Sequence, residues 1–167
     1  MIDLIIRNGK VIDGSGAEGI VTNIAIDNGT IVDIGQLEGM KSGNLIEANG
    51  MIVCPGFIDI HSHSDFTILV DPRAQSALAQ GVTTELIGNC GHGCAPITKS
   101  DRYISNIYGY NPLIDIDWKT TAEYMDKVET ARPAINIATL VPNGNLRLTA
   151  MRYPDQQATQ DEVDQMA

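Results

Sequence analysis

The fold is decided by residues 55–63, which read PGFIDIHSH. The apolar run at 57–60 has the length and composition of a buried strand, and it leads directly into two histidines. Side chains alternate between the two faces of a strand, so His61 and His63 project to the same side, where two imidazoles can share one metal ion. Barrels of parallel strands have their active sites at the C-terminal ends of the strands, so a histidine pair at this position could bind a catalytic metal ion. The motif is short, and a surface accident is the alternative interpretation.

A second group of polar residues follows the next expected strand, at 83–87. Residues 88–94 read GNCGHGC and place Cys90 at the C-terminal end of that strand. Neighbouring strands lie about 4.8 Å apart, so a thiolate on one strand end and imidazoles on the next can converge. Glycines on both sides allow close backbone approach. The sequence therefore predicts a metal site formed by His61, His63 and Cys90.

Other residues near these motifs allow more than one interpretation. Cys90 and Cys94 could also be buried small hydrophobes or a redox pair, because a lone C-x₃-C is a weak zinc signature. Cys54, in an apolar run, is expected to be structural. His92 could be a third ligand, a hydrogen-bonding group of a substrate pocket, or simply exposed. Asp65 could orient a ligand, if the strand continues past His63, or cap a loop.

Residues 1–52 have the pattern of a small β-module. Runs rich in Ile and Val at 3–7, 21–27 and 30–34 are separated by Asn8-Gly9, Asp13-Gly14 and Asn28-Gly29, which are typical of turns. Asn28-Gly29 predicts a hairpin, because a type I′ turn needs positive φ at both central residues.

Residues 53–167 alternate between apolar runs and stretches of helical period. Helices are expected at 73–80 and 120–131 and from 159 onward, with a third strand at 134–141. Thr120 with Glu123, and Thr159 with Glu162, form capping boxes that start the two later helices. This order predicts parallel strands with helical crossovers, and a long, functional connection at 91–118.

Size limits how much of a barrel can be present. A (β/α)₈ barrel needs roughly 250 residues, so these 167 can supply at most three of its eight strands. The predicted fold class is α/β: a partial β-sandwich module at 1–52 leading into the first three βα units of an incomplete TIM barrel at 53–167. The last expected helix starts eight residues before the end without a stop signal, so the chain is expected to be an N-terminal fragment. An open three-stranded sheet exposes edges, which favours self-association.

Composition narrows the classes of partner. The chain is 43% hydrophobic and 19% charged, with a formal net charge of −10, which argues for a globular protein and against nucleic acid or anionic membranes as partners. No run approaches the ~20 apolar residues of a membrane span, and the expected location is the cytoplasm. Three cysteines cannot all pair, so free thiols or metal ligands are expected.

These motifs together resemble the amidohydrolase superfamily, in which a small β-sandwich leads into a metal-bearing (β/α)₈ barrel. Residues 80–84, QGVTT, followed by GNCG at 88–91, are similar to the N-acyl-D-amino-acid deacylase (D-aminoacylase) branch. The resemblance covers nearly the whole chain. It departs from the family at Pro142-Asn143, where relatives usually carry Gly-His before Gly-x-Leu-Arg, and this departure bears on substrate preference.

The resemblance implies a function and a set of site residues. His61 and His63 would bind one metal position and Cys90 a tighter zinc position, while further histidine ligands and a general-base aspartate would lie beyond residue 167. The implied activity is zinc-dependent hydrolysis of the amide bond of N-acyl-D-amino acids, small-molecule substrates, and the isolated chain is expected to be inactive. The alternatives are a cyclic-amide hydrolase of the dihydroorotase or hydantoinase type, a non-catalytic truncated product, and a small structural domain with incidental histidines.

Overall fold

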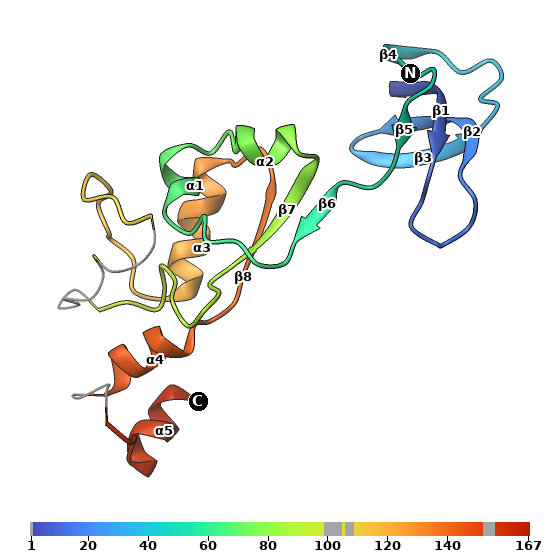
Figure 1. The fold of residues 1–167 in the computed structure, drawn as a ribbon. Coiled ribbons are helices and arrows are strands. Elements are labelled where there is room, and N and C mark those ends of the chain that lie inside the picture. Colours follow the sequence, from blue (N-terminus) through green and yellow to red (C-terminus); the bar gives the residue numbers. More distant parts are fainter. Residues whose placement is uncertain (1, 99–104, 106–108, 152–155) are drawn as a thin grey trace. The chain divides into compact units, whose positions relative to one another are not determined.

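The computed structural model describes residues 2–98, 105, 109–151 and 156–167, and part of the expected connection at 91–118 therefore lies outside the described residues. The chain forms two compact units, Met1–Pro55 and Gly56–Ala167 (Figure 1).

The first unit is a five-stranded sheet. Its strands are β1 (Ile2–Val11), β2 (Ile20–Asp27), β3 (Thr30–Gly35), β4 (Ser42–Glu47) and β5 (Ile52–Val53). The order is β3-β2-β1-β4, with β5 also pairing with β1, and both β4 and β5 run parallel to β1. The predicted hairpin is confirmed: β2 and β3 are antiparallel, and Asn28 and Gly29 have φ of 50° and 71°. The sequence pattern did not reveal β4 and β5.

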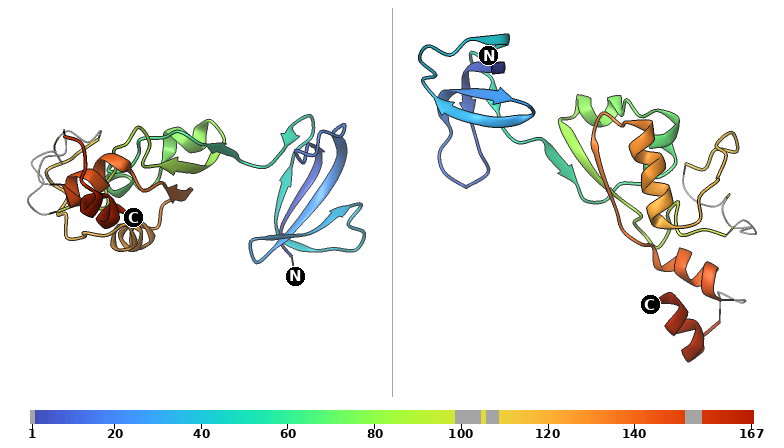
Figure 2. Two further views of the ribbon diagram at one scale, coloured as in Figure 1. Left: turned by 90° about the horizontal axis from the view of Figure 1, so that it is seen from below. Right: turned by 180° about the vertical axis from the view of Figure 1, so that it is seen from behind.

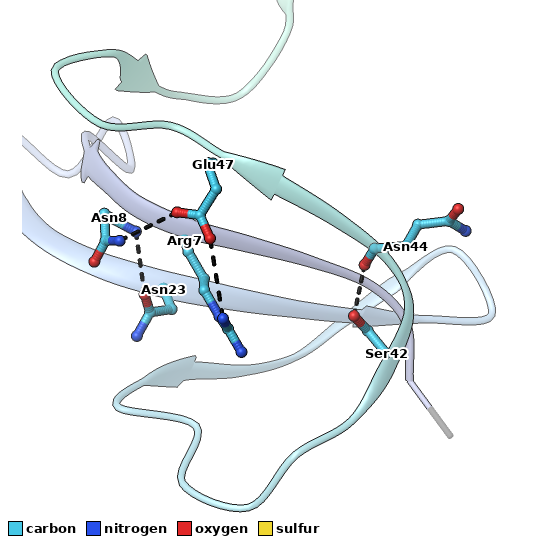
Figure 3. A network of polar contacts seen from close by, with 6 residues as sticks. All are labelled: Arg7, Asn8, Asn23, Ser42, Asn44 and Glu47. Carbon is cyan, nitrogen blue, oxygen red and sulfur yellow. Dashed lines mark hydrogen bonds and ion pairs between the residues drawn. The ribbon is translucent and has the colours of Figure 1, made fainter.

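Asn8-Gly9 is a bulge inside β1, so its interpretation as a turn is wrong. The pairing of β1 with β2 shifts register between Ile6 and Gly9, and Asn8 has a φ of 57°. The distorted backbone is secured by polar contacts: Asn8 N–H donates to Asn23 Oδ1 at 3.1 Å, and Asn8 Nδ2 donates to Glu47 Oε2 at 3.3 Å (Figure 3). Asparagine tolerates this conformation better than most residues, which lets one strand span both sides of the bulge.

In its described residues, the second unit contains a three-stranded parallel sheet and five helices. Its elements are β6 (Phe57–Asp59), α1 (Thr67–Val70), α2 (Gln75–Ala79), β7 (Val82–Ile87), α3 (Thr121–Ala131), β8 (Asn136–Thr139), α4 (Asn143–Ala150) and α5 (Gln160–Met166). The strand order is β6-β7-β8, and both pairings are parallel, which confirms the predicted crossover topology. Of the helices, α1 and α4 were not expected from the sequence.

The core of this unit lies between the sheet and α1, α2 and α3. It is built around Phe66, Ile87, Trp118, Tyr124 and Val128, all at most 3% exposed. Figures 1 and 2 show α1 and α3 side by side against the sheet. The indole N–H of Trp118 donates to the Cys94 carbonyl at 2.7 Å, so the core also ties down the loop that follows β7.

Both predicted capping boxes are confirmed. The Thr120 side chain accepts from the Glu123 N–H at the start of α3, and the Thr159 side chain accepts from the Glu162 N–H at the start of α5. Each glutamate side chain in turn accepts from the backbone N–H of its threonine. Satisfying otherwise unpaired N–H groups in this way fixes where each helix begins. In the described part of the chain, none of the helices has the length and apolarity to cross a membrane.

Candidate metal centre

His61 and His63 lie in the loop directly after β6. This strand ends at Asp59, earlier than the sequence pattern predicted, so the argument that His63 and Asp65 share a strand face does not hold. Asp59 Oδ1 accepts the His61 N–H at 3.0 Å and holds the chain as it leaves the strand. The two imidazole rings meet edge-on, with centroids 5.4 Å apart.

Cys90 lies in the loop after β7, in a backbone conformation that cysteine rarely adopts. Its φ is 56°, between Gly88 at 77° and Gly91 at 77°. A left-handed conformation costs a residue with a Cβ about 1–2 kcal/mol. Gly88 cannot be replaced freely, because a Cβ there would lie 2.6 Å from the carbonyl oxygen of Leu140, which directly follows β8. The loop thus keeps a strained cysteine at the end of the sheet, a pattern found at functional sites.

The three predicted donors come together. One ligand atom each from His61, His63 and Cys90 lies within 4.8 Å of the other two, and His61 Nε2 is 3.2 Å from Cys90 Sγ. In a tetrahedral zinc site the bond lengths imply nitrogen–sulfur separations of about 3.6 Å and nitrogen–nitrogen separations of about 3.3 Å. Two imidazoles and a thiolate are ligands suited to zinc, so this donor set fits a single ion with small side-chain adjustments.

Asp65, in the same loop as the histidines, is buried, at 2% exposed. Its Oδ1 accepts the Gly88 N–H at 3.1 Å, and its carbonyl oxygen accepts the Tyr124 hydroxyl at 2.7 Å, so it connects the two loops that carry the donors. Burial raises the pKa of Asp65, while backbone hydrogen bonds and the charge of nearby His63 act in the opposite direction.

The other candidates lie apart from the three donors. Cys94 is 1% exposed, and burial raises the pKa of its thiol, so it is a core residue. Cys54 is exposed, contrary to the structural role expected for it. His92 is exposed beside Gly144 at the start of α4, and it does not belong to the group of donors found among the described residues.

Two buried polar residues that support these loops were not recognised from the sequence. Asn145 in α4, 3% exposed, bonds to the backbone of the loop after Cys90. Glu85 in β7, 8% exposed, accepts hydrogen bonds from Ser62 and Ser64, the serines that alternate with the histidines. An acidic residue within a predicted strand was the available signal for Glu85.

A family model described as the amidohydrolase family matches residues 44–167. The chain belongs to the amidohydrolase family. Its recognition as similar to the N-terminal portion of the D-aminoacylase branch is confirmed by an N-acyl-D-glutamate deacylase of Alcaligenes xylosoxydans xylosoxydans, 36% identical over 163 residues. That match covers 96% of this amidohydrolase chain and 33% of the relative.

Solved structures of the same branch share the fold of this amidohydrolase chain. The N-acyl-D-glutamate deacylase of Bordetella bronchiseptica, solved with zinc and a phosphonate inhibitor, has a TM-score of 0.89 and 35% identity over 99% of this chain and 34% of its own. A D-aminoacylase has a TM-score of 0.85 and 30% identity over 99% of this chain and 35% of its own. The chain spans about a third of the length of these relatives.

Relatives of the cyclic-amide class are more distant. An L-hydantoinase of Arthrobacter aurescens has a TM-score of 0.58 at 17% identity, a likeness of fold alone. The predicted α/β fold class, with the beginning of a TIM barrel, is confirmed by the two deacylase structures, which share the fold over 99% of this chain.

Proposed function

We propose that this chain supplies part of the active site of a zinc-dependent deacylase that hydrolyses the amide bond of N-acyl-D-amino acids, with His61, His63 and Cys90 as metal ligands. The convergence of these three donors, from loops far apart in the sequence, carries the proposal. The zinc in the related N-acyl-D-glutamate deacylase structure supports the choice of metal.

The bound ion would contribute Lewis acidity toward the amide carbonyl and make water acidic enough to yield hydroxide near pH 7. The residues of this chain would hold the ion and orient its ligands. His61 and Cys90 approach from neighbouring strand ends, and Asp65 ties their loops together through Gly88. We further propose that Asp65 orients His63, and that exposed His92 contacts the substrate.

The domain assignment completes the proposal. Residues 1–52 would be part of the β-sandwich, and residues 53–167 the first three βα units of the barrel. The cyclic-amide alternative has no specific support, because the hydantoinase likeness extends to the fold alone. Substrate would be a small N-acyl amino acid, and the enzyme would work in the cytoplasm.

Metal content tests the site. The purified protein, loaded with zinc and passed through a desalting column, should retain zinc, whereas Cys90→Ala and His61→Ala should retain far less. Cys54→Ser is the matched control, because it removes an exposed thiol outside the donor group and should retain zinc like the wild type. Equal zinc content in the wild type and Cys90→Ala would contradict the proposal.

Substrate stereochemistry tests the reaction. A protein that joins residues 1–167 to the remaining strands of a deacylase barrel should, when loaded with zinc, release amino acid from N-acetyl-D-glutamate but not from the L-enantiomer, and a chelator should abolish the release. Residues 1–167 alone should release none. Hydrolysis of both enantiomers at similar rates would exclude a D-specific deacylase.

A further inference from the structure

Resting on the proposed metal site, we propose that Glu85 is a positioning residue that fixes the His61–Ser64 segment in the geometry required for metal binding. The carboxylate acts through Ser62 and Ser64, which occupy the alternate positions of that segment. In this proposal Glu85 does not itself contact the metal.

Every polar group of Ser62 is bonded to β7 or to its following loop. Its N–H donates to the Leu86 carbonyl at 3.1 Å, and its carbonyl accepts from Asn89 Nδ2 at 3.3 Å. Its hydroxyl donates to Glu85 Oε2 at 2.9 Å. Ser62 stands between the two histidines, so these bonds fix the backbone from which both imidazoles project.

Ser64, two residues after Ser62, bonds the same carboxylate. Its hydroxyl also donates to Glu85 Oε2, and its N–H donates to the Ser62 hydroxyl at 3.3 Å. One carboxylate that accepts from both serines therefore holds the residues on either side of His63 against β7.

Glu85 also connects the two halves of the site. It lies in β7, the strand that leads into the Cys90 loop, while the serines belong to the loop after β6. Glu85 is 8% exposed, so its hydrogen bonds to the serines are protected from water. If the donor side chains are already in place before the metal binds, less conformational entropy is lost on binding. Groups that orient metal ligands in other proteins raise metal affinity in this way.

Substitution at this position is feasible because Glu85 and Ser64 border a cavity of about 420 Å³ that Thr67, Asp71 and Gln75 also line. Glu85→Leu removes the acceptor, and Glu85→Gln keeps an acceptor oxygen of the same shape. Thr83→Val is the control, because Thr83 precedes Glu85 by two residues and therefore lies on the same face of β7.

Two measurements decide the question: the zinc Kd from competition with a chelator, and the thiolate-to-cobalt charge-transfer absorption of the cobalt-substituted protein. Glu85→Leu should bind zinc about 10–100-fold more weakly and show an altered cobalt spectrum. Glu85→Gln and Thr83→Val should resemble the wild type in both. The rescue by glutamine separates a positioning role from a general loss of packing.

The outcomes are distinguishable. If Glu85→Leu is folded and has the Kd and spectrum of the wild type, or if Glu85→Gln is as weak as Glu85→Leu, the role of Glu85 is refuted while the metal site stands. If Glu85→Leu does not fold, the Ser62→Ala/Ser64→Ala double variant removes the same bonds with Glu85 retained, and wild-type affinity there refutes the role. If the wild type itself binds no zinc, the proposed function fails first.

Discussion

Asn145 and Gly93 form a reciprocal pair of hydrogen bonds: Asn145 Oδ1 accepts the Gly93 N–H at 3.1 Å, and Asn145 Nδ2 donates to the Gly93 carbonyl at 2.8 Å. The same amide nitrogen donates to the Pro96 carbonyl at 2.9 Å. One side chain from α4 thus satisfies three backbone groups of the loop that follows Cys90, where no regular secondary structure could pair them.

Asn145→Leu should lower the free energy of unfolding by about 2–4 kcal/mol, because it leaves these backbone groups buried without partners. Urea unfolding measures the change. The control is Asn143→Ala, at an exposed position of the same helix, which should change stability by less than about 0.5 kcal/mol. Equal effects of the two substitutions would show that the clamp contributes nothing specific.

Cys90→Gly should stabilise the metal-free protein. Relief of the left-handed conformation, about 1–2 kcal/mol, exceeds the backbone entropy that glycine loses, about 0.5–1 kcal/mol. Urea unfolding in the presence of a chelator should show the gain. Cys90→Ala removes the same sulfur but keeps the strain, so a similar gain in that variant would disprove the explanation.

Gly88→Ala should be more harmful than Gly91→Ala, although both glycines have a φ of 77°. The methyl group at Gly91 meets only an ordinary contact at 3.9 Å, so it should cost about 1–2 kcal/mol for conformation alone. At Gly88 it would also approach the Leu140 carbonyl to 2.6 Å, and the loss should exceed about 3 kcal/mol. Thermal unfolding of the two variants measures the difference. Indistinguishable values would mean that β7 and β8 can separate at this point without penalty.

The three cysteines should differ in reactivity toward an alkylating reagent. Without metal, Cys54 and Cys90 should react quickly because both are exposed. Cys94 should react only after unfolding, since burial raises the pKa of its thiol and the thiolate is the reactive form. Zinc should protect Cys90 and leave Cys54 reactive, as followed by mass spectrometry of the labelled peptides. Labelling of Cys90 at an unchanged rate in zinc would contradict its role as a ligand.

Much of the second unit could be predicted from the sequence because its signals are local. Thr120 with Glu123 defines a helix start within four residues, and the alternation of apolar strands with helical stretches implies parallel pairing. Convergence of the histidines with Cys90 followed from the same topology. Their identity as ligands stays a prediction.

The features that the sequence did not reveal depend on distant contacts. Strands β4 and β5 are short and form by pairing with β1, and the bulge at Asn8 is secured by Asn23 and Glu47. Glu85 and Asn145 were not singled out from the sequence, because the groups that they bond lie 21 or more residues away along the chain. Only the folded chain brings their partners to them.

The clamp on the Cys90 loop has a consequence for biosynthesis. Asn145 lies 52 residues after Gly93, so the ribosome has already made β7, α3 and β8 before the Asn145 side chain can bond to the Cys90 loop. A nascent polypeptide that stops short of this helix carries its cysteine and both histidines without the bonds that hold the loop. At the proposed site, metal capture in the final geometry would therefore be a late event in the making of the protein, later than the synthesis of His61, His63 and Cys90.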